Sequence, residues 1–344
     1  MRRIAILGHF AFGHEASNGQ TIKTKIFAKE LQHIFGENDV TLEDTYGGWR
    51  FVIRMPFVIF RLLFSHQNMI IFPASGSSRI LPIVMAFENL LFHRSLHHVA
   101  IGSQLPRWVR KSKILKRSLS TFAGIYVETR FMKDELNDLS LHNVARMPNC
   151  KELHILKESE LASPVSPPYK LCTFSRVMEE KGIADAINAV KRCNNLLGKT
   201  TFTLDIYGQV EQQEWFNKLM QNQPSEISYK GIVPFGESTQ VLRNYFLLVF
   251  PTRYKIEGFA GTLIDAMAAG LPVIASDCQS NIEILKQGQT GLLYTLGSVD
   301  ELTERLMLIS KNPMQIEKMR PYCIKEAHLY QPQNVIKPLS ERIA

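Results

Sequence analysis

The feature that most constrains the fold of this chain is an alternation of short apolar runs with longer amphipathic stretches, which occurs twice. In the first half the apolar runs are Ile4–Leu7, Met69–Phe72, His98–Ile101 and Gly124–Val127. In the second half they are Tyr169–Phe174, Phe202–Tyr207, Leu247–Pro251 and Pro272–Ser276. Short continuous apolar runs are typical of strands buried on both faces of a parallel sheet. The pattern predicts an α/β fold made of two Rossmann-like, doubly wound domains.

A polar, proline-rich stretch separates the two alternations. It has the sequence KESELASPVSPP and covers residues 157–168. A chain of 344 residues is too long for one ordinary core and suits two domains. We expect an N-terminal domain at 1–157, a C-terminal domain at 158–330, and a segment at 331–344 that could pack back on the first. Because such sheets bind ligands at the carboxyl ends of their strands, we expect the ligand in a cleft that the domains face.

Composition and cysteine usage restrict the class of protein. The chain is 45% hydrophobic and 21% charged, which is typical of a globular protein rather than a disordered one. No apolar stretch reaches the roughly 18 residues of a membrane span, and the run at Ile4–Leu7 is too short for a signal peptide. Scattered cysteines favour a reducing, cytoplasmic location without disulfides or a metal framework. They are Cys150, Cys172, Cys193, Cys278 and Cys323.

The excess positive charge is confined to the first half. Residues 1–157 contain 21 Lys and Arg against 12 Asp and Glu, whereas residues 158–344 contain 19 against 20. Two stretches, 49–66 and 107–117, combine these cations with apolar and aromatic residues, as helices that lie on an anionic membrane do. The same stretches could instead form a buried helix and a solvated face. No nucleic-acid motif is present, so we expect no nucleic-acid partner.

The segment PTRYKIEGFAGTLIDAMAAGLPVIASD, residues 251–277, carries the clearest chemical signal. A strand ends at Pro251, two glycines follow at Gly258 and Gly261, and a helix is predicted to begin near residue 262. Glycines before a helix let backbone N–H groups approach a phosphate, and the helix N-terminus favours negative charge. Glu257 on the loop and Asp265 in the helix could each accept hydroxyl groups. The alternative is a surface loop with two solvated acids.

A second segment, CTFSRVMEEKGIADAI at 172–187, places two cations after another strand. Arg176 and Lys181 lie on the loop that leads from that strand into the next helix. Cations at the carboxyl end of a strand are well placed to neutralise a diphosphate. In isolation they could equally be surface residues.

Together the two segments resemble glycosyltransferase family 4, a family of retaining enzymes with the GT-B fold that includes bacterial surface and capsular polysaccharide enzymes. The family pattern places Arg and Lys around an EKG turn, here Arg176, Lys181 and Gly182. It continues with Glu-x7-Glu inside EGFxG, here residues 257–261 with Asp265 in the second acidic place. The strand that ends at Gly208 and the segment YKGIVPF at 229–235 also fit. The resemblance covers most of 170–295 and is weaker in the first half, where GHFAFGHEASNGQTIKT at 8–24 and MPNC at 147–150 resemble family segments.

The resemblance implies a nucleotide diphosphate sugar as donor and roles for particular residues. Arg176 and Lys181 would bind the diphosphate and stabilise the leaving group, and Glu257 would hold sugar hydroxyls, so these three would be catalytic. The other implied donor-binding residues are Gly258, Phe259, Ala260, Gly261, Thr262, Asp265, Ile232, Val233 and Gly208. In the first half, Gly19 and Gln20 would belong to the family's glycine loop. Because no Asp-x-Asp motif occurs, we expect no metal and no cofactor.

The chain departs from the family pattern at two places. Asp265 stands where Glu is usual, which shortens the reach to a ribose by one methylene. Many relatives carry a histidine after a central strand, and here Gly102 follows the comparable strand. The candidate histidines are His14, His97 and His98, each of which reads more simply as an ordinary polar or packed residue.

The implied function is transfer of a sugar to a saccharide acceptor, expected to be lipid-linked, in surface polysaccharide synthesis at the inner face of the membrane. Two alternatives remain. A non-catalytic partner would keep this fold without turnover, and a nucleotide-sugar epimerase would release free sugar without an acceptor. A phosphorylase would need a lysine-bound cofactor site, which the sequence does not contain.

Overall fold

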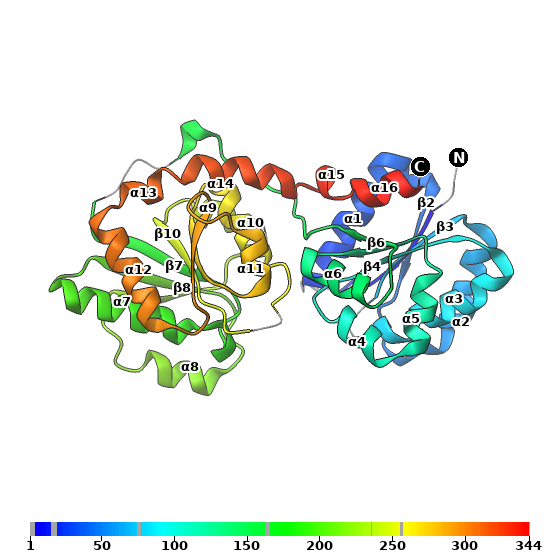
Figure 1. The fold of residues 1–344 in the computed structure, drawn as a ribbon, viewed down its shortest axis with the longest axis horizontal. Coiled ribbons are helices and arrows are strands. Elements are labelled where there is room, and N and C mark those ends of the chain that lie inside the picture. The colour runs from blue at the N-terminus through cyan, green and yellow to red at the C-terminus, as the bar shows by residue number, and fades with distance from the viewer. Residues whose placement is uncertain are drawn as a thin grey trace. The chain divides into compact units, whose positions relative to one another are not determined.

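The computed structural model describes residues 4–14, 19–73, 77–161, 166–234, 236–254 and 257–343. They form two compact units (Figure 1). Unit 1 is Met1–Glu152 together with Tyr330–Ala344, and unit 2 is Leu153–Leu329. The divisions fall near the boundaries 157/158 and 330/331 that the sequence predicts. The chain has already joined unit 2 before residue 157, because the N–H of Leu156 donates to the carbonyl of Ala268 at 3.0 Å.

Unit 1 is built on a parallel sheet with the strand order β2-β1-β3-β4-β5-β6. The strands are β1 (Ile4–Gly8), β2 (Val40–Asp44), β3 (Asn68–Phe72), β4 (Ser95–Val99), β5 (Gly124–Val127) and β6 (Val144–Arg146). The helices are α1 (Gly19–Phe35), α2 (Trp49–Ser65), α3 (Leu81–Phe92), α4 (Leu105–Lys111), α5 (Lys113–Ser120), α6 (Arg130–Asp138), α15 (Pro332–Val335) and α16 (Lys337–Ile343). The order reverses between β1 and β3, which makes their carboxyl ends the switch point of this sheet.

Both faces of the unit 1 sheet are covered, because successive strand residues point to opposite sides. In β3, Met69 and Ile71 belong to a core shared with helices α2 to α6, whereas Ile70 and Phe72 belong to a core shared with α1, α15 and α16. The last segment of the chain therefore packs within unit 1, where α15 contacts α1 and α16 contacts β5.

Unit 2 is a second parallel sheet, with the order β12-β11-β10-β7-β8-β9. Its strands are β7 (Tyr169–Phe174), β8 (Phe202–Tyr207), β9 (Ile227–Gly231), β10 (Leu247–Phe250), β11 (Val273–Ser276) and β12 (Gly291–Tyr294). Its helices are α7 (Ile183–Leu197), α8 (Gln213–Met220), α9 (Ser238–Leu242), α10 (Gly261–Ala268), α11 (Gln279–Ile284), α12 (Val299–Lys311), α13 (Met314–Glu317) and α14 (Arg320–Ala327). This is the Rossmann strand order, and its switch point lies between β7 and β10.

The two predicted doubly wound domains are confirmed, and one predicted strand is displaced. The strand expected at His98–Ile101 is β4, which begins at Ser95 and ends at Val99. Ser95 and His97 are polar, so they conceal the beginning of this strand, in which every residue after Ser95 is buried. All five cysteines are free and buried.

Candidate functional site

The switch point of unit 2 brings two loops together. Because β7 and β10 are paired neighbours, the loops that follow them leave the same edge of the sheet. Gly182, at the end of the first loop, has φ +69°, and a Cβ atom there would lie 1.9 Å from the carbonyl oxygen of Pro251 in the second. Only glycine fits this backbone conformation and this close approach. The EKG turn is therefore what allows the loops to touch.

Two of the predicted catalytic residues meet at this contact. Lys181 ends a 3₁₀ turn over Glu179–Lys181, and its Nζ forms an ion pair with Oε2 of Glu257. The hydroxyl of Thr252 donates to the same carboxylate oxygen at 2.9 Å. Nζ of Lys181 also lies 5.9 Å from the ring centroid of Tyr254. The two charged side chains are only 9% and 13% exposed, so their orientation is well constrained.

Arg176, the third predicted catalytic residue, lies on the same loop with a different environment. Its side chain is exposed and has no hydrogen bond or ion pair with any residue that the structure describes. Its guanidinium therefore lies at the same edge of the sheet as the Lys181–Glu257 ion pair and can bind an anion there.

The sequence analysis missed a further cation at this edge, Arg253. Its guanidinium donates two hydrogen bonds to the carboxylate of Asp185 in the first turn of α7, at 2.6 and 2.5 Å, and its N–H donates to the carbonyl of Glu180. Asp185 is buried, and its hydrogen bonds raise the pKa of Arg253. Arg253 follows the end of strand β10 as Arg176 follows the end of β7, so its position after a strand is the sequence signal for it.

The predicted phosphate-binding backbone lies at the beginning of α10. No described backbone carbonyl accepts a hydrogen bond from the N–H groups of Gly258, Gly261 or Thr262. Gly261 and Thr262 lie in the first turn of α10, whose N–H groups have no partner within the helix, and Gly258 lies on the loop before it. Ala260 is the N-cap residue, and the buried ring of Phe259 anchors the loop. Asp265 lies one turn further into the helix and is 6% exposed. The structure therefore gathers residues 257–265 around one helix N-terminus.

The remaining predicted donor residues lie at the same edge but further along the sheet. Gly208 follows β8, and a Cβ atom there would lie 1.8 Å from the carbonyl oxygen of Ser175, so steric fit to the β7 loop explains this glycine. Ile232 and Val233 follow the edge strand β9; Ile232 is 66% exposed and Val233 is half-buried. Phe235, at the end of the YKGIVPF segment, lies outside the described residues.

Unit 1 has a cavity of its own at its switch point. It has a volume of about 530 Å³ and is lined by residues that follow β1, β2 and β3, among them His9, Tyr46 and Ser77, and by α2. Asp44 shapes the rim by accepting N–H groups of Phe10, Phe12 and Tyr46 at 2.9 Å each. Burial acts to raise the pKa of Asp44, but these hydrogen bonds outweigh it and lower the pKa. The sequence analysis did not predict this cavity.

The predicted glycine loop of the first half is described only from Gly19 onward. Gly19 is the first residue of α1. The side-chain nitrogen Nε2 of Gln20 is buried without a partner among the described residues. Lys23, in the next turn, is held in a buried ion pair with Glu128 at 2.6 Å. Among the residues that the structure describes, the side chain of Gln20 therefore lacks a hydrogen-bond partner, whereas Lys23 has one.

The candidate histidines divide into two groups. His97 and His98 are buried in β4, and burial lowers the pKa of each to about 4, so both are neutral at physiological pH. His97 is hydrogen-bonded to Ser95 and Tyr126, which supports the interpretation that His97 is an ordinary packed residue. His14 is exposed, with its ring centroid 4.6 Å from that of Tyr46. His9, which the sequence analysis passed over, bonds to Thr21 and lines the cavity.

The described residues include no group of three or more His, Cys, Asp or Glu side chains that could hold a metal ion. None of the helices described has both the length and the apolar character needed to cross a bilayer.

Comparison with known proteins gives a consistent result for unit 2. Residues 158–329 match the family described as glycosyl transferases group 1. The GtfA subunit of the UDP-N-acetylglucosamine–peptide N-acetylglucosaminyltransferase of Streptococcus pneumoniae is 28% identical over 172 residues, covering 47% of this chain and 33% of that protein. The amylovoran biosynthesis glycosyltransferase AmsK of Erwinia amylovora is 23% identical over 279 residues, covering 71% and 68%. The chain thus aligns with about a third of the GtfA subunit.

The fold is shared more widely than the sequence. The crystal structure of the HepE protein of Anabaena in complex with UDP matches 98% of this chain and 98% of its own, with a TM-score of 0.75 at 13% identity. The likeness confirms the GT-B fold expected from the sequence.

Proposed function

The chain belongs to the group 1 glycosyl transferases, and from this we propose that it is a retaining, metal-independent glycosyltransferase. It moves a sugar from a nucleotide diphosphate sugar to a saccharide acceptor. The observation that carries the proposal is the meeting of Lys181, Glu257 and the N-terminus of α10 at the switch point of unit 2. Ligands bind at such switch points in open parallel sheets.

The donor diphosphate would occupy the N-terminus of α10. The N–H groups of Gly258, Gly261 and Thr262 and the helix dipole favour an anion there. The exposed guanidinium of Arg176 and the ammonium of Lys181 would balance the charge that develops as the diphosphate leaves. Donors fixed in place before the reaction stabilise such charge more than solvent does.

The ion pair between Lys181 and Glu257 has a role in this scheme. It holds the carboxylate on the loop, and Thr252 fixes the same oxygen. The second carboxylate oxygen of Glu257 remains to accept sugar hydroxyls. When a diphosphate binds, Lys181 would be shared between the phosphate and Glu257, so both groups would be positioned by one cation.

Asp265 would accept the ribose hydroxyls of the nucleotide, and the backbone around Ile232 and Val233 would face the base. Uridine is the first base to test, because HepE was crystallised with UDP and the GtfA enzyme takes its name from a UDP-sugar. The shorter side chain of Asp265 predicts a weaker hold on the ribose than a glutamate would give.

The acceptor would enter the cavity of unit 1. Its polar rim residues, among them His9 and Tyr46, suit a saccharide, whereas Phe51, Val52 and Met55 of α2 make its wall apolar. A lipid-linked saccharide has a polar part that matches the rim and an apolar part that matches the wall. AmsK is named for amylovoran biosynthesis, which supports a role in surface polysaccharide synthesis, with the chain cytoplasmic and peripheral on the inner face of the membrane.

A thermal-shift screen with uridine, guanosine, adenosine and cytidine diphosphates, with and without EDTA, tests the donor site. A ligand at about 100 times its dissociation constant stabilises by about 2.7 kcal/mol, which raises the melting temperature by a few degrees. We expect a rise with one nucleotide that EDTA leaves unchanged and that Arg176→Ala abolishes. Arg192→Ala is the matched control, because Arg192 is an exposed arginine of α7 that pairs with Asp300.

Turnover distinguishes the proposal from its alternatives. Arg176→Ala and Lys181→Ala should each lower turnover about 100- to 1,000-fold, the usual effect of removing one donor to a developing anion. No shift with any nucleotide would favour the non-catalytic partner. Release of free sugar at full rate without an acceptor would favour the epimerase.

A further inference from the structure

Helix α2 is apolar on two sides, and only one side is covered. Its inner stripe, from Phe51 to Leu63, is buried in the core of unit 1. An outer stripe repeats at helical spacing, and its side chains are between 47% and 80% exposed. It consists of Trp49, Ile53, Phe57, Phe60 and Phe64. Single exposed apolar residues are ordinary, but a continuous stripe marks an interaction surface.

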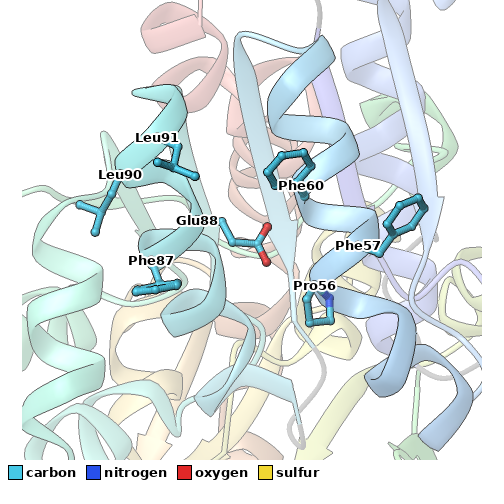
Figure 2. A pocket seen from close by; sticks show the side chains of 7 residues that line it. All are labelled: Pro56, Phe57, Phe60, Phe87, Glu88, Leu90 and Leu91. Carbon is cyan, nitrogen blue, oxygen red and sulfur yellow. The ribbon is translucent and has the colours of Figure 1, made fainter.

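Helix α3 extends this surface across a groove. Phe87, Leu90 and Leu91 of α3 are between 64% and 74% exposed. The groove between α2 and α3 has a volume of about 490 Å³, and apolar side chains line it except for one acid, Glu88 (Figure 2). The rings of Phe60 and Phe92 join the two helices edge to face, with centroids 5.0 Å apart.

The helices around the groove are strongly basic. α3 contacts α2 and α5, and α4 and α5 also contact each other. Helices α2, α4 and α5 carry no Asp or Glu and nine cations, which are Arg50, Arg54, Arg61, Arg107, Arg110, Lys111, Lys113, Lys116 and Arg117. Arg61 pairs with Glu43 and Arg110 with Glu135. The other seven form no ion pair with any residue in the described ranges.

We propose that the α2–α3 groove and its basic surround dock this chain on an anionic lipid bilayer. The exposed aromatic and aliphatic side chains would enter the boundary between headgroups and acyl chains, and the Arg and Lys side chains would reach the lipid phosphates. Charge argues against a second copy as the occupant. A symmetric dimer through this face would set the same cations against each other.

The docking surface adds a membrane partner to the proposed glycosyltransferase function, and its biological role rests on that function. Helix α2 lines both the groove, through Pro56, and the cavity proposed for the acceptor, through Val52 one turn earlier. The helix that touches the bilayer would therefore also contact a saccharide attached to a lipid. A chain docked in this way would meet its acceptor at the surface where the acceptor is anchored.

Glu88 gives the docking surface a dependence on pH. Its carboxylate reaches into the space between the helices (Figure 2), and Oε2 is buried without a partner among the described residues. Burial raises the pKa of Glu88 to about 7, and no charged neighbour contributes to the shift. Helix α3 packs against α2, α5 and the 3₁₀ turn Ser77–Arg79, and the charged groups on these elements are Arg50, Arg54, Arg61, Arg79, Lys113, Lys116 and Arg117. A neutral Glu88 enters a bilayer more easily, so docking should weaken as pH rises through the pKa.

Sedimentation of the full chain with lipid vesicles tests the proposal. We expect binding to vesicles of phosphatidylglycerol mixed with phosphatidylcholine, and binding at least about tenfold weaker to phosphatidylcholine alone or at high salt. The double variant Phe57→Ser/Leu91→Ser should lower binding to the anionic vesicles at least about tenfold. Its matched control is Ile282→Ser/Leu308→Ser, which removes two apolar side chains of unit 2 that are 53% and 55% exposed and should bind as wild type.

Three results would overturn the docking surface. They are no binding to the anionic vesicles at low salt, equal loss in both double variants, and a wild-type dimer that Phe57→Ser/Leu91→Ser separates without vesicles. Circular dichroism melting of each variant checks the fold. Nucleotide-induced thermal shifts on the same samples separate the two proposals: a normal shift without vesicle binding rejects only the docking surface, and vesicle binding without any shift rejects only the donor site.

Discussion

At the scale of the residue, Gly182 determines whether the two loops of the proposed donor site can meet. Its φ of +69° and its contact with the carbonyl of Pro251 impose two separate requirements. Gly198 offers a comparison, because it has φ +65° with no atom within 4 Å of an added Cβ. The two glycines have the same conformation, and only one is also confined by its neighbours.

Substituting alanine at each glycine separates these requirements. Gly198→Ala should lower the free energy of unfolding by about 1–2 kcal/mol, the usual cost of a left-handed alanine. Gly182→Ala should cost at least about 2 kcal/mol more, because the backbone of Pro251 must move. Urea unfolding of both variants measures the difference. Equal losses of unfolding free energy in the two variants would show that the close approach of the loops does not affect stability.

Arg253 is a second residue whose neighbours decide its importance. Arg253→Ala would leave the buried carboxylate of Asp185 without its partner, which should lower the free energy of unfolding by about 2–3 kcal/mol. In Arg192→Ala, Asp300 is the acid that is left without a partner, and the side chains of Arg192 and Asp300 are both more than half exposed. That change should cost less than about 1 kcal/mol. Similar losses in urea unfolding of the two variants would contradict a structural role for the Arg253 pair.

At the scale of the element, the sequence predicted the interior strands and missed the edges. The strands left out were β2, β6, β9 and β12, which are the outer strands of the two sheets. An edge strand is covered less completely, so its sequence lacks a continuous apolar run, as the half-exposed residues of β9 illustrate. The loop motifs of unit 2 were found because they follow interior strands.

The unit 1 cavity was missed for a related reason. Its lining comes from residues after three different strands and from α2, which are far apart in sequence and share no motif. The stretch 49–66 was read as either a buried helix or a membrane surface. Helix α2 has one buried side and one exposed side, so the helical pattern was correct and its outer stripe accounts for the second reading.

The α2–α3 pair should also respond to pH in solution. The raised pKa of Glu88 means that the folded chain holds this proton between pH 4.5 and about 7, whereas the unfolded chain releases it. The stabilisation is therefore complete below pH 4.5 and is lost as pH rises through about 7. Glu88→Gln should be more stable than wild type above that pH by about 1 kcal/mol, after allowance for screening of a half-buried group.

Thermal melting on both sides of the Glu88 pKa measures this effect. Glu283→Gln, at a half-buried acid of α11 in unit 2, is the control and should keep the pH dependence of wild type. A variant at Glu88 that is no more stable than wild type at high pH would mean that the groove admits water to the carboxylate.

At the scale of the whole molecule, the two units should differ in their resistance to acid. The buried His97 and His98 of unit 1 have pKa values lowered from 6.5 to about 4. The unfolded chain takes up these protons first, so the stability they confer is present above pH 6.5 and is lost as pH falls toward 4. The cost is up to about 3 kcal/mol for each histidine.

Hydrogen exchange across this pH range should therefore show unit 1 losing protection before unit 2. His98→Leu should move the loss to lower pH, because neither ring nitrogen of His98 has a partner among the described residues. His33→Leu, at an exposed histidine of α1, should leave the profile unchanged. Simultaneous loss in both units, unaffected by His98→Leu, would contradict this account.

The return of residues 330–343 to unit 1 has a consequence for how the protein is made. Ile336, Leu339 and Ile343 fill the core beside Tyr126 and Met147, yet they are the last part of that core to leave the ribosome. Unit 2 is continuous in sequence and can fold as soon as it has been synthesised. During translation, synthesis of unit 1 therefore begins first and ends last. Unit 2 can fold while the unit 1 sheet still lacks the helices that cover one of its faces.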